Sequence, residues 1–133
     1  MMSWDRLALQ ITSCLFATVV VHAYYLNLVV YHHLFLVVTV LSLLFHCTHL
    51  PFWRVADKCA AHLSFLYIFV NDSPAAFKLG KAWVVLFPLC VCVLWFGQSW
   101  LSDMFSISTY WIHALLHVMA ATGLHLYMHE LYV

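Results

Sequence analysis

The stretch Ser106 to Glu130, SISTYWIHALLHVMAATGLHLYMHE, is long and apolar enough to cross a membrane, yet it carries four histidines. His113 and His117 are spaced i and i+4, so in a helix they lie one turn apart on a single face, close enough to bind one metal ion together. An imidazole at membrane depth needs a partner, because an unsatisfied polar group is costly in hydrocarbon. We therefore expect the rest of the chain to supply further metal ligands or hydrogen-bond acceptors.

The composition indicates an integral membrane protein. Of the 133 residues, 66% are hydrophobic and only 8% are charged, which is too little charge for the surface of a soluble domain of this size. The formal net charge is zero with histidine neutral, so no basic face favours nucleic acid as a partner. Low charge and many aromatic residues also fit a chain that packs against partner membrane subunits.

The apolar runs predict an all-α, polytopic membrane helix bundle of about five transmembrane helices, forming a single transmembrane domain over residues 1–133. Pro51 and the charged residues after it predict a loop between the second and third helices. The run Asn71 to Pro74 predicts a turn that closes the third helix. The predicted spans are residues 7–25, 29–49, 55–70, 82–100 and 107–129, with boundaries good to a few residues.

Five spans would place the two termini on opposite sides of the membrane. Arg6, Arg54 and Lys58 lie on the N-terminal side, whereas Lys78 and Lys81 lie on the other side. The difference of one positive charge favours a cytosolic N-terminus, with the C-terminus on the opposite side.

The same alternation of sides brings polar residues from three predicted spans into one leaflet. Ser42 and His46 lie in the last turns of the second span, Asp57 in the first turn of the third, and His113 and His117 in the early turns of the fifth. Ser42 and His46 are also spaced i and i+4, so this pair presents one helix face as well. We expect the five side chains to meet near headgroup depth.

These residue types suit a hydrolytic zinc site. Three neutral imidazoles, from His46, His113 and His117, leave one position of a tetrahedral zinc ion open, and that arrangement activates a water molecule. Asp57 could orient this water or accept its proton, and the Ser42 hydroxyl could hold it by a hydrogen bond. The expected reaction is zinc-dependent hydrolysis of an amide or ester of a membrane lipid, with the metal polarising the carbonyl group.

In these residues the sequence resembles the CREST superfamily of membrane zinc hydrolases. That superfamily includes the alkaline ceramidases, the adiponectin and progestin receptor relatives, and the GPI-remodelling proteins. The resemblance rests on Ser42-Leu-Leu-Phe-His46, then Asp57, then His113-Ala-Leu-Leu-His117, in that order. It implies that the three histidines bind zinc and that the serine and the aspartate contact the activated water. The short separation between His46 and Asp57 looks more like the ceramidase and GPI-remodelling branches, which implies ceramidase-like chemistry.

The remaining histidines support a second interpretation. Histidines near both faces of a small bundle are typical of a bis-histidine haem protein, such as an electron-transfer cytochrome or a respiratory-complex anchor subunit that holds haem b. The histidines expected near the opposite face, where solvation at the interface is their simplest role, are His22, His32, His33, His125 and His129. The candidate axial pairs are His22 or His33 with His125, and His46 or His62 with His117.

Simpler roles are open for the same residues. A histidine on an apolar face can be a hydrogen-bonded packing residue, Asp57 could cap its helix and pair with Arg54, and Ser42 could bond to its own helix carbonyl. The third interpretation is therefore a non-catalytic membrane subunit of a larger assembly. Bound zinc without haem absorption favours the hydrolase, a Soret band favours the cytochrome, and neither favours the subunit.

Overall fold

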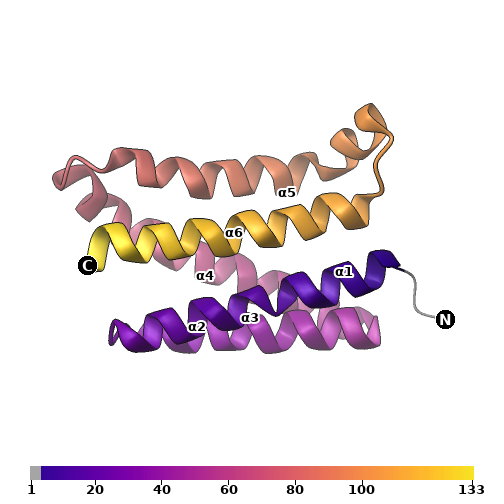
Figure 1. Cartoon of the computed structure of the whole chain (residues 1–133), viewed down its shortest axis with the longest axis horizontal. Coiled ribbons are helices and arrows are strands. Elements are labelled where there is room, and N and C mark those ends of the chain that lie inside the picture. Colours follow the sequence, from indigo (N-terminus) through magenta and orange to yellow (C-terminus); the bar gives the residue numbers. More distant parts are fainter. Residues whose placement is uncertain (1–3) are drawn as a thin grey trace.

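Helices make up most of the computed structural model, which describes residues 4–133 and contains no strand in that range. The long helices run side by side along one direction, with α1 beginning at one end of the bundle and α6 ending at the other (Figure 1). The predicted all-α helix bundle is confirmed. The elements are α1 (Trp4–Ser13), α2 (Leu15–Tyr25), α3 (Val29–Thr48), α4 (Pro51–Lys78), the short 3₁₀ helix η1 (Ala82–Val85), α5 (Leu86–Phe105) and α6 (Thr109–Tyr132).

Within the part of the chain that the structure describes, three helical segments are long and apolar enough to cross a membrane: Trp4–Tyr25, Val29–Thr48 and Ala82–Phe105. The first consists of α1 and α2, which follow each other with a local interruption at Cys14, and the third consists of η1 and α5. A spanning helix needs about 20 mainly apolar residues. These segments support a membrane protein. α4 and α6 have 28 and 24 residues and carry the charged and histidine side chains discussed below.

The loop expected at Pro51 and the turn expected at Asn71 to Pro74 are both wrong, because α4 runs through both regions. The connection before α4 is short: His49 ends α3 in the left-handed conformation, with φ of 56°, and Leu50 is extended. Pro51 then occupies the first helical position, where its missing N–H removes no intrahelical hydrogen bond. The sequence rule that proline ends a helix did not apply, because this proline begins one.

A buried carboxylate explains why α4 continues past Pro74. Asp72 is only 5% exposed. Its Oδ1 accepts a hydrogen bond of 2.8 Å from the Tyr132 hydroxyl, and its Oδ2 accepts one from the Tyr31 hydroxyl. A buried carboxylate is stable only with such donors, and they come from α3 and α6. Tertiary contacts therefore outweigh the local turn signal.

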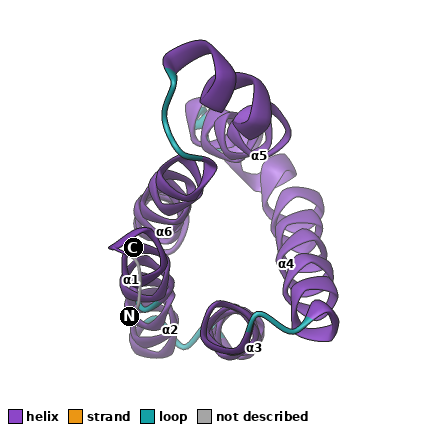
Figure 2. Ribbon diagram, turned by 90° about the vertical axis from the view of Figure 1, so that its right-hand side faces the viewer, coloured by secondary structure: helices purple, strands orange, loops and turns teal. Residues whose placement is uncertain are grey.

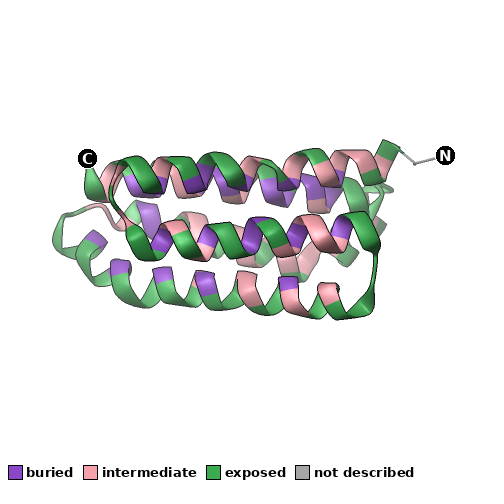
Figure 3. Ribbon diagram, turned by 90° about the horizontal axis from the view of Figure 1, so that it is seen from below, coloured by how far each residue is buried: buried purple, intermediate pink, exposed green. Residues whose placement is uncertain are grey.

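The helices pack in an order that leaves one pair, α4 and α5, with little direct backbone packing. α3 packs on α4 on one side and on α1 and α2 on the other. α1 and α2 also pack on α6, and α6 packs on α5. α5 and α4 are connected mainly through η1 (Figure 2). No residue of α5 is buried, whereas the other long helices have buried stripes on their facing sides (Figure 3).

Apolar packing and polar chemistry occupy different halves of the bundle. The largest buried cluster joins α2, the first half of α3 and the second half of α6, through residues such as Phe16, Val19, Phe35, Ala121 and Met128. The end of α3, the start of α4 and the start of α6 lie in the other half. That half contains the histidine cluster.

Candidate metal centre

Three of the predicted site residues meet at one point. His46 comes from the last turn of α3, while His113 and His117 lie one turn apart on α6, and each offers a ring nitrogen within 4.8 Å of the other two. The ring centroids are 5.6 Å apart for His46 and His113, and 5.4 Å apart for His46 and His117. His46 is 2% exposed and His117 is 4% exposed. The structure therefore brings together the three histidines that the sequence proposed as metal ligands.

Hydrogen bonds to α1 fix the orientation of the His117 ring. Its Nδ1 lies 3.2 Å from Thr12 Oγ1 and 3.4 Å from Ser13 Oγ. Both hydroxyls already donate to helix carbonyls, Thr12 to Ala8 at 2.9 Å and Ser13 to Leu9 at 2.7 Å. In this arrangement they accept a proton from His117 Nδ1. The neutral ring then carries no proton on Nε2, whose lone pair is free for a metal ion.

The other two rings also fit a metal site. His113 Nδ1 lies 3.3 Å from Gln98 Oε1, an oxygen that can only accept, so Nε2 of His113 is left unprotonated. His46 Nε2 is buried and has no hydrogen-bond partner among residues 4–133. A buried polar atom without a partner is costly, and a metal ion would satisfy it. Three neutral imidazoles with anchored rings match the donor set that zinc prefers.

Ser42, Asp57 and His117 lie on the lining of one cavity. Ser42 is 2% exposed, and its Oγ lies 3.2 Å from Ser13 Oγ, so it is connected to α1. Asp57 is 6% exposed and lines the same cavity as Ser42 and His117. The pairing of Asp57 with Arg54 that the sequence left open is not made, since the one ion pair among the described residues joins Lys81 to Glu130, at 3.2 Å.

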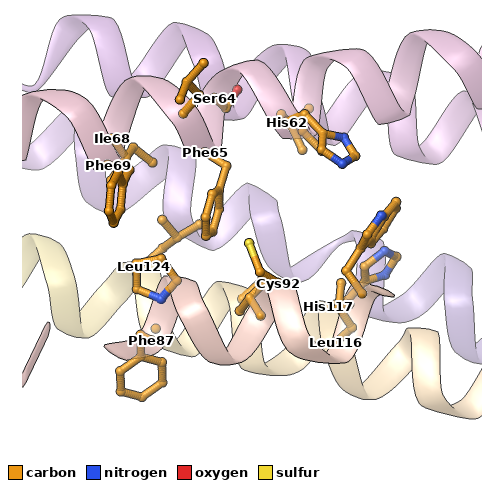
Figure 4. Close-up of a pocket in the computed structure, with 18 of the residues that line it drawn as sticks. His62, Ser64, Phe65, Ile68, Phe69, Phe87, Cys92, Leu116, His117 and Leu124 are labelled. Carbon is orange, nitrogen blue, oxygen red and sulfur yellow. The ribbon is translucent and has the colours of Figure 1, made fainter. Parts of the chain in front are cut away.

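The cavity that these residues line has a volume of about 540 Å³ and is bounded by α2 to α6. Its lining is mostly apolar, and Ser64 and Tyr127 are polar residues away from the end at which Ser42, Asp57 and His117 lie. His62 and His117 lie toward that end, and Phe69 lies toward the other (Figure 4). The histidine cluster therefore adjoins a space suited to a hydrocarbon chain.

Sequence reasoning missed the residues that orient the imidazoles. Thr12 and Ser13 come from the first predicted span, and Gln98 comes from the fourth. Gln10 also reaches this region, donating to the His46 carbonyl at 3.2 Å. The sequence feature that could have identified them is the polar run Gln10-Ile-Thr12-Ser13 inside an apolar span. Polar residues at membrane depth need partners, so this run indicates a polar contact.

The haem interpretation draws on two groups of histidines. His46 and His117 lie in the cluster described above, with ring centroids 5.4 Å apart, whereas His22 and His125 lie elsewhere. His22 Nδ1 lies 2.8 Å from His125 Nδ1, and the two rings stack with centroids 5.0 Å apart. A porphyrin between these two residues would require them to separate. His32 and His33 face backbone carbonyls of Val20 and Val29, at 3.2 and 2.7 Å.

Comparisons of the chain with protein-family models, with curated proteins and with solved structures found no match.

Proposed function

We propose that this chain is a zinc-dependent intramembrane hydrolase of a lipid amide or ester. The observation that supports the proposal most strongly is a cluster of three convergent imidazoles, one of which, His117, lines a mostly apolar cavity. His46, His113 and His117 would hold the ion. Zinc bound there would act as a Lewis acid toward the scissile carbonyl and toward water.

Asp57 has the chemistry and the position for proton transfer. It is a carboxylate on the lining of the cavity that Ser42 and His117 also line. In hydrolysis, water adds its oxygen to the carbonyl carbon, and the bond to the leaving nitrogen or oxygen breaks. Asp57 accepts the proton that water loses and returns it to the leaving atom, so that a fatty acid and an amine or alcohol are released. Ser42 positions the water through its hydroxyl.

The lining supports a lipid as the substrate class. Phenylalanine, leucine and valine side chains from α3, α4, α5 and α6 surround most of the cavity. They offer no hydrogen-bond partners for a polar substrate, whereas burial of an acyl chain is favourable at about 25 cal/mol per Å² of apolar surface. The carbonyl of such a lipid would meet the histidine end.

The excess of positive charge at the N-terminal end supports a proposal for how the chain is oriented in the membrane. Arg54 and Lys58 are exposed on the first turns of α4, at the same end as α1, and Lys78 lies at the other end of α4. The positive-inside rule then places the N-terminus and the metal centre toward the cytosol. A glycosylation tag at the C-terminus should be modified, and a tag at the N-terminus should not.

Release of fatty acid by the purified protein tests the activity. The full chain, supplied with zinc in a neutral detergent, is incubated with a panel of lipid amides and esters, and fatty acid is measured by mass spectrometry. We expect release from at least one lipid, its loss in His117→Ala, and its retention in His129→Ala, since His129 is exposed and lies outside the cluster. Equal release by wild type and His117→Ala would overturn the proposal.

A further inference from the structure

A lysine stands next to the histidine cluster, on the outer side of the cavity. Lys58 follows Asp57 on α4 and is exposed. Its Nζ lies 5.9 Å from the centroid of the Trp95 ring, which α5 provides. Trp95 in turn contacts His113, with centroids 5.4 Å apart. A positive charge is therefore held over an aromatic face that touches a proposed metal ligand.

Lys58 makes no ion pair within 4.0 Å with a carboxylate in the part of the chain that the structure describes. Among residues 4–133 the ion pair within 4.0 Å joins Lys81 and Glu130, at the other end of the bundle. Asp57 is adjacent in sequence, but it is buried on the cavity lining. The three imidazoles are neutral ligands, so a divalent cation among them would add further positive charge near Lys58. Like charges this close repel, and an anion bound between them would remove the repulsion.

We expect such an anion to enter from the membrane between α4 and α5. These two helices meet mainly through η1, and none of the α5 residues is buried. Both helices line the cavity, through residues such as Phe65 on α4 and Cys92 on α5 (Figure 4). Lys58, His62 and Trp95 bridge the two helices at the end far from η1, since the His62 and Trp95 rings are also in contact, at 5.5 Å.

The length of the cavity fits one acyl chain with its headgroup at Lys58. His117 and Tyr127 both line the cavity and are ten residues apart on α6, which corresponds to a rise of about 15 Å. That is half of the roughly 30 Å hydrocarbon core of a bilayer, which is the depth of one leaflet. A lysine side chain on the first turns of α4 can extend its charged end toward the headgroups.

We propose that Lys58 recognises an anionic headgroup, a carboxylate or a phosphate, so that the substrates are single-chain lipids with a negative charge beyond the scissile bond. This inference rests on the proposed function, because it assigns a substrate class to the same site. Lys58 is a specificity-determining residue that contacts the headgroup and takes no part in bond breaking.

Binding of matched lipid analogues tests the inference without requiring turnover. Hexadecyloxyacetate, hexadecyloxyethyl phosphate and hexadecyloxyethanol share one alkyl chain and an ether that cannot be hydrolysed, and differ in the charged or neutral end group. Their affinities are measured by calorimetry for the zinc-supplied full chain in a neutral detergent. We expect at least one of the anionic analogues to bind about tenfold more tightly than the neutral one, and Lys58→Gln to lose that difference.

Lys78→Gln is the matched control, because Lys78 is exposed at the other end of the same helix. It should keep the preference of the wild type.

A preference for one anionic analogue identifies carboxylate or phosphate as the group recognised. Equal affinities in the wild type, or a preference that survives in Lys58→Gln, would overturn the inference. If the lipid panel yields no fatty acid but Lys58 still sets the preference, the hydrolase proposal fails and the headgroup site stands. If fatty acid is released but the analogues bind equally well, the hydrolase proposal stands and the headgroup inference fails.

Discussion

His117 Nδ1 lies 3.2 Å from Thr12 Oγ1, although 105 positions of sequence separate the two residues. When the Thr12 hydroxyl gives its own proton to the Ala8 carbonyl, it accepts from the imidazole. This contact connects the first helix to the last and sets which nitrogen of His117 can bind a metal. The first span is therefore part of the candidate metal centre, although it provides none of the proposed ligands.

Removing the acceptors of His117 should weaken zinc binding. In Thr12→Val with Ser13→Ala, the His117 ring loses both partners of Nδ1, and we expect zinc affinity to fall by about 10- to 100-fold. The measurement is competition with a chelator of known affinity. Thr48→Val is the control, since Thr48 is exposed and bonds only within its own region. Unchanged affinity in the double variant would show that these hydroxyls do not orient the ring.

Asp57 should be needed for turnover and not for metal binding. Asp57→Asn keeps the shape of the side chain but removes the proton acceptor, so we expect the hydrolysis rate to fall by about 100- to 10,000-fold while zinc content stays at the wild-type level. Asp103→Asn, at an exposed position on α5, should change neither quantity. Full activity in Asp57→Asn would remove this residue from the mechanism.

Close approach of α5 to α6 should make Gly123 sensitive to substitution. A Cβ atom at Gly123 would lie 2.5 Å from Cδ1 of Phe87, so Gly123→Ala must displace that ring. We expect a loss of about 1–3 kcal/mol in stability, measured as a lower thermal midpoint in detergent. At Gly97 an added Cβ would meet only Leu101 Cδ1, at 4.0 Å. Gly97→Ala should therefore keep or raise the midpoint, and an equal loss in both variants would contradict this packing argument.

The contacts of Asp72 should stabilise the end of the bundle far from the metal centre. Asp72→Ala leaves the buried Tyr31 hydroxyl without its acceptor, and we expect a loss of about 1–3 kcal/mol in unfolding free energy. Asp103→Ala serves as the exposed control. Zinc affinity should stay unchanged in both variants, because Asp72 lies outside the histidine cluster. A stable Asp72→Ala protein would mean that the carboxylate is not needed to hold α4 against α3 and α6.

The sequence was sufficient to predict the helical class and the meeting of His46 with His113 and His117. Apolar runs fix the number of long helices, and alternation across a membrane fixes which helix ends share a side. The spacing of His113 and His117 fixes one helix face. These three inputs do not depend on packing details. The structure agrees with the helical class and with the meeting of the three histidines.

Features that depend on distant contacts were not predictable. The length of α4 is one case, since Pro74 alone indicates a break, and only the tyrosines that bond to Asp72 show why the helix continues. The placement of Lys58 over Trp95 is another, because it joins two helices whose relative position no periodicity specifies. The contact of His22 with His125 could be predicted as a shared face, but not as a direct pairing of rings.

The most direct test of the metal centre is metal analysis of the detergent-purified full chain, together with its visible absorption spectrum. We predict about one zinc per chain and no Soret band, with the zinc lost in His113→Ala and His117→Ala and kept in His129→Ala. Zinc at wild-type stoichiometry in both cluster variants would contradict the site. A Soret band without zinc would instead indicate a haem protein, and the absence of both would indicate a membrane subunit without a metal centre.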